Sequence, residues 1–160
     1  MPHDFAPAHF RAGESEGTWI MQQQISVITL GIADISRSKR FYGEGFGWKP
    51  VFETPDIVFY QMNGLMLGTW LTANLKADMQ RPDLARPGAF SLAHNVPTQQ
   101  DVQPLLDRLA AHGGRLLRTA DAPPHGGFRG YVADPDDHAW EIAFNPAWPI
   151  AADGRVTFGL

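Results

Sequence analysis

The sequence predicts an α+β fold made of two βαβββ modules whose curved sheets form a shared cavity. The order of expected elements is the first reason, because strand, helix and three strands occur twice in succession. The second is Asn63-Gly64, which lies between two strand-like runs and is the residue pair that most favours a two-residue hairpin. The third is AWEIAF at residues 139–144, where bulky apolar residues alternate with small residues and one carboxylate, as in a pleated strand.

The first module is expected at about residues 24–71. Residues 24–32 alternate and are rich in β-branched side chains, which predicts a strand. Asp34 or Ser36 can cap a following helix that ends near Gly43 or Gly45. Three strands are then expected at 48–53, 57–62 and 65–71. Residues 1–22 mix Pro, Gly, His and acidic residues without a period and are expected to form a flexible extension.

The second module is expected at about residues 89–146, after a linker at 72–88 that contains two prolines and several charges. Its strands are predicted at 89–96, 115–119, 128–133 and 139–144. An amphipathic helix is predicted at 98–112, ended by Gly113 and Gly114. A tight acidic turn separates the last two strands, and residues 147–160 form a tail.

The composition is that of an ordinary globular protein and excludes several classes of function. The net charge is −4 and no cluster of Lys and Arg is present, which argues against nucleic-acid binding. The absence of Cys excludes disulfides, thiolate nucleophiles and Cys-ligated zinc. No apolar run approaches the length of a membrane span, so no membrane association is expected, and the cytoplasm is the expected location.

Two segments resemble the signatures of the vicinal oxygen chelate superfamily: ITLGIADISRSKRFYGEGFGW at 28–48 and GYVADPDDHAWEIAFNP at 130–146. This group includes glyoxalase I, extradiol dioxygenases, fosfomycin-resistance transferases and bleomycin-binding proteins. FSLAHNV, GGFRGYVADPDDHAWEIAFNPAWP and DGRVT are similar to an uncharacterised glyoxalase-like branch. The resemblance covers about residues 24–158 and implies paired modules, a small-molecule ligand and a homodimer.

In metal-dependent members, each module supplies one ligand from its first strand and one from its last. Carried over by position, these four places fall at Val27, Gly68, Ser91 and Glu141. A divalent cation needs several converging His or carboxylate ligands, and only Glu141 offers one. The expectation is therefore that no metal or other cofactor is bound, with Glu141 as the single candidate ligand.

Strand alternation predicts which side chains line the cavity. Glu141 is expected to share its face with Thr29, Phe59, Gln61, Trp70, Ser91 and Asn95. Arg129 and Tyr131 lie on the neighbouring strand, where either an ion pair or a hydrogen bond to Glu141 is possible. His125, in a Pro- and Gly-rich loop, is a candidate at the cavity mouth. His94 lies on the opposite face and is interpreted as a packed core or interface residue.

Three functions remain open on these grounds. The first is a small-molecule binding protein without a catalytic metal. The alternative is a glyoxalase-like lyase or isomerase, or a dioxygenase-related enzyme, that uses Glu141 as general base or metal ligand. Arg129 or Tyr131 would then steady the developing oxyanion. The third is a structural homodimer whose cavity is filled by its own side chains.

Overall fold

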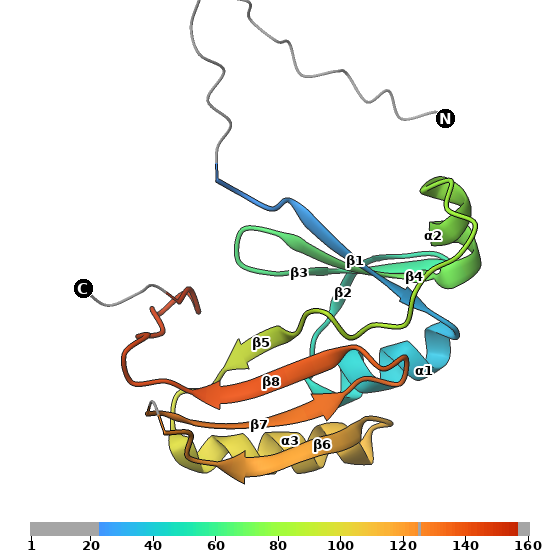
Figure 1. The fold of residues 1–160 in the computed structure, drawn as a ribbon. Helices are drawn as coiled ribbons and strands as arrows, with labels where there is room; N and C mark the ends of the chain where they lie inside the picture. Colours follow the sequence, from blue (N-terminus) through green and yellow to red (C-terminus); the bar gives the residue numbers. More distant parts are fainter. Residues whose placement is uncertain (1–22, 125, 157–160) are drawn as a thin grey trace, which may run out of the picture.

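A computed structural model describes residues 23–124 and 126–156 and contains two four-stranded sheets (Figure 1). The first consists of β1 (Val27–Ile32), β2 (Pro50–Glu53), β3 (Ile57–Gln61) and β4 (Met66–Leu71), in the order β1-β4-β3-β2. The second consists of β5 (Leu92–Asn95), β6 (Arg115–Asp121), β7 (Phe128–Ala133) and β8 (Ala139–Phe144), in the order β5-β8-β7-β6. In each sheet the first strand runs parallel to the last one, and the other pairs are antiparallel. The predicted α+β fold with two modules is confirmed.

One helical segment follows the first strand of each module. In the first module, α1 (Ile35–Lys39) continues into the π-helical turn η1 (Arg40–Gly45). Asp34 is the cap, because its carboxylate accepts a 2.7 Å hydrogen bond from the Arg37 amide. In the second module, the 3-10 turn η2 (Gln99–Asp101) precedes α3 (Val102–Ala111). Pro104 lies in the first turn of α3, where its missing N–H breaks no intrahelical hydrogen bond.

The segment predicted as a plain linker begins with a helix, α2 (Thr72–Asp78), directly after β4. A helix can form at the start of the expected linker because the two prolines lie only at 82 and 87, beyond its end. α2 packs close to β1 at Gly31, where an added Cβ would lie 3.3 Å from Thr72 Oγ1. The Thr72 hydroxyl also donates a 3.0 Å hydrogen bond to the Ile32 carbonyl. No helix in the described residues is long and apolar enough to cross a membrane.

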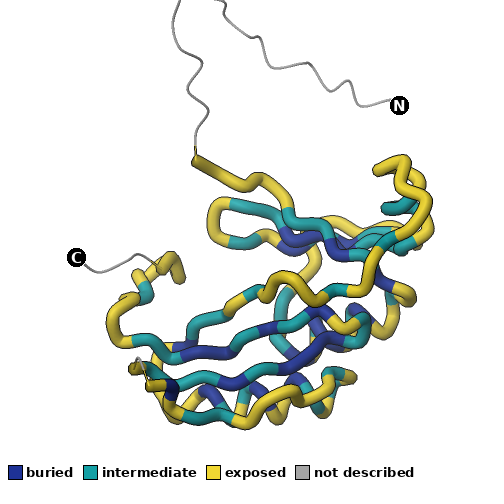
Figure 2. Tube along the Cα trace, in the orientation of Figure 1, coloured by how far each residue is buried: buried dark blue, intermediate teal, exposed yellow. Residues whose placement is uncertain are grey.

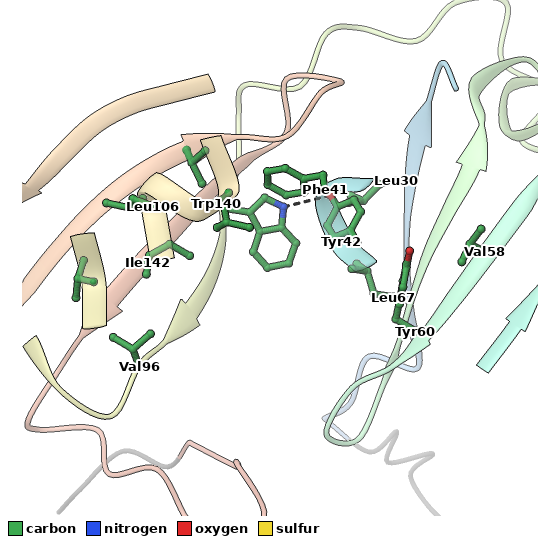
Figure 3. Close-up of a cluster of buried hydrophobic side chains, with 13 residues drawn as sticks. Leu30, Phe41, Tyr42, Val58, Tyr60, Leu67, Val96, Leu106, Trp140 and Ile142 are labelled. Carbon is green, nitrogen blue, oxygen red and sulfur yellow. Dashed lines mark hydrogen bonds between the residues drawn. The ribbon is translucent and has the colours of Figure 1, made fainter. Parts of the chain in front are cut away.

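A single hydrophobic core is shared by the two modules (Figure 3). Phe41 and Tyr42 of η1 are fully buried and pack between the sheets. The ring of Trp140, on β8, lies 5.9 Å from that of Tyr42, and α3 contributes Leu106 and Leu109. Buried and intermediate residues alternate along β7 and β8, whereas exposed residues predominate along the edge strand β6 (Figure 2). The modules therefore pack on each other mainly through their helical side.

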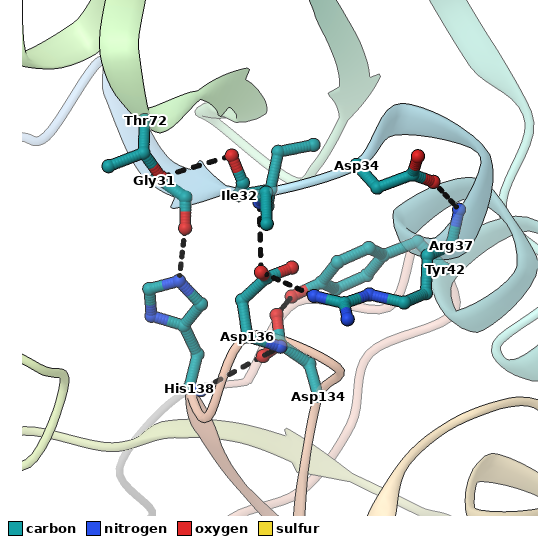
Figure 4. A network of polar contacts seen from close by, with 10 residues as sticks. Gly31, Ile32, Asp34, Arg37, Tyr42, Thr72, Asp134, Asp136 and His138 are labelled. Atoms are coloured by element: carbon teal, nitrogen blue, oxygen red, sulfur yellow. Dashed lines mark hydrogen bonds and ion pairs between the residues drawn. The ribbon is translucent and has the colours of Figure 1, made fainter.

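The turn at residues 134–138, called the acidic turn below, holds the second module against the first (Figure 4). Asp136 Oδ1 accepts hydrogen bonds from the Ala33 amide at 2.9 Å and from Arg37 at 2.8 Å. His138 Nε2 donates to the Gly31 carbonyl at 2.9 Å. Asp134 is also buried. Its amide donates a hydrogen bond to the His138 carbonyl, and its carboxylate accepts one from the His138 amide. A segment predicted only as a tight turn thus joins the two modules.

Candidate ligand-binding site

Glu141 and Tyr131 are direct partners across β7 and β8. Both side chains are partly exposed on the face that the alternation predicted. The pKa of Tyr131 is raised, first by burial and then by the negative charge of Glu141 and the hydrogen bond to it. Of the two neighbours considered for Glu141, Tyr131 is the one that faces it directly across the strands.

Arg129 forms an ion pair with Asp121 instead of Glu141. Its Nη1 also donates to the Asp121 carbonyl at 3.3 Å, and the Arg129 side chain is only 15% exposed. The ion pair follows from the register, since Arg129 on β7 lies opposite Asp121 on β6. The prediction ended this strand at residue 119, which left Asp121 in a loop and hid the pairing.

A cavity of about 340 Å³, called the Glu141 cavity below, lies on this face of the second sheet. It is lined by Ala93, Asn95, Glu141, Ala143, Asn145, Trp148 and Val156. Ala93 pairs with Glu141, and Asn95 pairs with Ala143. The small side chains of the two alanines leave space beside Glu141, as the sequence predicted. A smaller hollow of about 90 Å³, bordered by Arg129 and Phe128, also reaches Glu141.

A larger cavity, of about 570 Å³, lies between the modules and is called the inter-module cavity below. The first module contributes residues from Gly47 to Lys49 and from Tyr60 to Asn63, including the predicted Gln61. The second module and the C-terminal segment contribute Ala93, His94, Asn95, Pro97, Ile150, Gly154 and Val156. Because Ala93, Asn95 and Val156 line both cavities, the two adjoin along β5.

His94 is packed as predicted, with its ring 5.5 Å from that of Phe46 and 6.2 Å from that of Trp48. Burial lowers its pKa, which favours the neutral imidazole. The same side chain also lines the inter-module cavity, a role that the sequence reasoning missed. Alternation along β5 identified its face correctly, but the residues across the module boundary could not be inferred from one strand.

The other predicted residues lie apart from Glu141. The predicted register of the hairpin is confirmed, with Gln61 opposite Met66 and Phe59 opposite Gly68. Thr29 also pairs with Gly68, and Trp70 lies opposite Ile57. Phe59, Trp70 and Thr29 are not among the residues that line the Glu141 cavity; Thr29 lines a different one, beside α2.

Ser91 was predicted to lie within a strand, but β5 begins at Leu92, so Ser91 precedes it and is exposed. Ser91 is not among the residues that line the Glu141 cavity. His125 lies outside the described residues.

The four family positions for a metal do not fit one here. Within residues 23–124 and 126–156, no group of three or more His, Asp or Glu side chains is arranged to hold a metal ion. Gly68 offers no side chain, and an added Cβ would lie 2.8 Å from the ring of Phe59, which fills that space. Val27 is apolar and 46% exposed.

Comparisons with known proteins agree with this architecture. The family model described as the Glyoxalase/Bleomycin resistance protein/Dioxygenase superfamily matches residues 24–142. A glyoxalase-related enzyme from Fulvimarina pelagi, whose crystal structure is known, shares 64% identity with a TM-score of 0.85 over 87% of this chain and 100% of that chain.

More distant relatives carry other names. The metallothiol transferase FosB of Lysinibacillus sphaericus is 25% identical over 122 residues, which are 75% of this chain and 81% of the transferase. A lactoylglutathione lyase from Agrobacterium tumefaciens shares the fold at 19% identity and a TM-score of 0.62, over 80% of this chain and 98% of that one. The family match, the paired βαβββ modules and the 64% identical relative lead to one conclusion: this chain belongs to the glyoxalase/bleomycin resistance protein/dioxygenase superfamily.

Proposed function

We propose that this protein binds a small organic molecule in the adjoining inter-module and Glu141 cavities, without a catalytic metal. The observation that carries the proposal is the shared wall of the two cavities, which Asn95 forms together with Ala93 and Val156. A ligand at this wall contacts both modules and has a carboxylate within reach.

The chemistry of the walls suits a small-molecule site. Such sites combine a largely apolar lining with a few polar groups that fix orientation. Around the Glu141 cavity, the alanines and Trp148 supply the apolar part, and Glu141, Asn95 and Asn145 supply the polar part. Tyr131 faces Glu141 from the neighbouring strand.

Absence of a metal requirement is part of the proposal. It rests on the ligand count, because Glu141 is the only metal-binding side chain at the four family positions. The packing of Phe59 over Gly68 supports it, since a longer side chain at position 68 would have to displace the ring. The ligand then has to be held by hydrogen bonds and apolar contact alone.

A thermal-shift screen of small organic molecules, run with added divalent cations and again with a chelator, tests the proposal. A true ligand raises Tm equally in both conditions, because binding to the folded state stabilises it by mass action. The shift should shrink in Glu141→Gln and Asn95→Ala. It should persist in Glu44→Gln, a matched control that alters an exposed carboxylate on η1. Stabilisation that appears only with a cation contradicts the metal-free proposal.

We also propose that the protein is a homodimer. Several large apolar side chains remain exposed on the first module: Ile25, Val27, Val51 and Phe52 are 61%, 46%, 58% and 54% exposed. Val51 and Phe52 lie on β2, the edge strand of the first sheet, and edge strands readily pair with another chain. Sedimentation velocity should give twice the chain mass, and Phe52→Lys should shift the protein toward the monomer; a wild-type monomer at high concentration contradicts this.

A further inference from the structure

A third cavity, of about 480 Å³, lies beside α2 and is called the α2 cavity below. Its walls come from β1, from α2, from the segment that follows α2 up to Phe90, and from the acidic turn. It shares no lining residue with the inter-module or Glu141 cavity. The proposed function therefore does not use it.

One wall of the α2 cavity is apolar. It contains Leu75 and Met79 of the α2 region and Leu84 and Phe90 of the following segment. Met79 is 43% exposed and Phe90 is 51% exposed, although both are large hydrophobic residues. Apolar surface of this kind, gathered at one cavity, marks an interaction site more often than scattered exposed residues do.

Two arginines border the same cavity. Arg81 and Arg86 are exposed, and within the described residues neither side chain forms an ion pair or a hydrogen bond. Other arginines differ in this respect: Arg37, Arg115, Arg118, Arg129 and Arg155 each pair with an aspartate. The free guanidinium groups give this cavity a positive rim in a chain whose net charge is −4.

The acidic turn adds unused hydrogen-bonding capacity to the wall. His138 Nε2 donates to the Gly31 carbonyl, which fixes a proton on that nitrogen. His138 Nδ1 is buried and has no partner in the described part of the chain, and the same holds for Asp136 Oδ2. Buried polar atoms are normally paired, so two unpaired ones in the wall of one cavity point to contents that can form hydrogen bonds.

Asp136 does not cancel the positive rim. Its Oδ1 is already held by the Arg37 guanidinium and the Ala33 amide, and its side chain is only 9% exposed. The charge of Asp136 is therefore balanced by Arg37 of the first module. Arg81 and Arg86 remain available for an anion from outside.

We propose that the α2 cavity is a second binding site, which takes a small amphipathic anion with an aliphatic body and a carboxylate. The aliphatic body lies against Leu75, Met79 and Phe90, and the carboxylate is bound by Arg81 and Arg86. Arginine suits this role because its planar guanidinium matches the geometry of a carboxylate. A ligand hydroxyl that reached the turn would meet the free Nδ1 of His138.

Isothermal titration of the full chain with octanoate tests the proposal. Octanoate should bind, and the Arg81→Gln/Arg86→Gln variant should weaken binding by about tenfold, the effect expected for loss of two solvent-exposed charge pairs. Phe90→Ser should weaken binding as well, through the loss of apolar contact. Lys39→Gln/Arg155→Gln is the matched control: it removes two positive charges that line none of the three cavities and should leave the affinity unchanged.

Other probes separate this site from alternatives. Octyltrimethylammonium, with the same chain and the opposite charge, should not bind, and butyrate should bind much more weakly than octanoate. Equal affinity for the arginine variant and the wild type, or tight binding of the cation, overturns the proposal. Glu141→Gln should leave octanoate binding intact; if it abolishes binding, the anion occupies the Glu141 cavity and the α2 site is wrong, whereas the proposed function is not.

Discussion

The hydroxyl of Tyr42 donates a 2.6 Å hydrogen bond to Asp134 Oδ2, and this bond joins the first helical segment of one module to the acidic turn of the other. Trp140 Nε1 donates to the same hydroxyl at 3.2 Å. All three residues are buried, so the network lies in the shared core and not at its surface. Burial and the charge of Asp134 raise the pKa of Tyr42 well above its usual value, which keeps its phenol protonated as the donor.

Removal of this hydroxyl should destabilise the fold. In Tyr42→Phe, the buried Asp134 carboxylate and the Trp140 N–H each lose a partner, and a loss of about 1–3 kcal/mol in the free energy of unfolding is expected. Urea unfolding measures it. Tyr131→Phe is the comparison, since that hydroxyl is on a partly exposed strand and should cost less. Equal losses in the two variants would contradict a special role for the buried network.

Asp134 should make stability depend on pH. Burial raises its pKa in the folded state, against the opposing effects of His138 and the Tyr42 hydrogen bond. Between the ordinary carboxyl pKa of about 4 and the raised value, the folded state holds more protons than the unfolded state, so stability falls as pH rises through this window.

Asp134→Asn removes this titration and should reduce the slope of stability against pH above about 4 relative to the wild type. Asp134 Oδ1 accepts hydrogen bonds from the backbone amides of Asp136 and His138, and the side-chain oxygen of an asparagine can accept the same two bonds. Urea midpoints measured across the acid range provide the check. Parallel curves for the two proteins would show that Asp134 does not titrate in this way.

Glu141 should control the ionisation of Tyr131. The charge of Glu141 and its hydrogen bond contribute to the raised pKa of Tyr131, so Glu141→Gln should lower that pKa toward the usual tyrosine value. NMR titration of the ring resonances resolves Tyr131 from the fully buried Tyr42 and Tyr60. Glu44→Gln should leave it unchanged, and an unchanged value in Glu141→Gln would mean that burial alone is responsible.

Gly68 should be intolerant of a side chain for a local reason. An added Cβ lies 2.8 Å from Phe59 Cε1, so Gly68→Ala should cost about 1–3 kcal/mol in the free energy of unfolding, as overpacked sites do. Phe59→Ala removes the obstructing ring. The double variant should therefore be more stable than the sum of the two single losses predicts. Strict additivity in this cycle would show that the ring is not the obstacle.

Local patterns were sufficient for much of the fold. The bounds of β7 and β8 agree with the predicted ranges, because their alternation and flanking turns are encoded within a few residues. The opposition of Phe59 and Gly68 followed from the two-residue turn at Asn63-Gly64 in the same way. Antiparallel pairing of the neighbouring strands β7 and β8 is enough to place Tyr131 opposite Glu141.

The rest depends on contacts between distant parts of the chain. Arg129 pairs with Asp121 because β6 runs two residues longer than its sequence pattern indicated. His94 lines a cavity because Trp48 of the other module lies beside it. The free arginines beside α2 fell in a segment that looked like a linker, where no periodicity reveals a binding wall.

The hydrogen bonds from the acidic turn to the first module determine which positions in this contact tolerate substitution. Asp136 and His138 bind the main chain of the first module, at the Ala33 amide and the Gly31 carbonyl. Any residue other than proline presents the same amide at position 33, whose side chain is exposed. A saturation scan should therefore find position 33 permissive and positions 136 and 138 restrictive, although all three take part in the same contact between the modules.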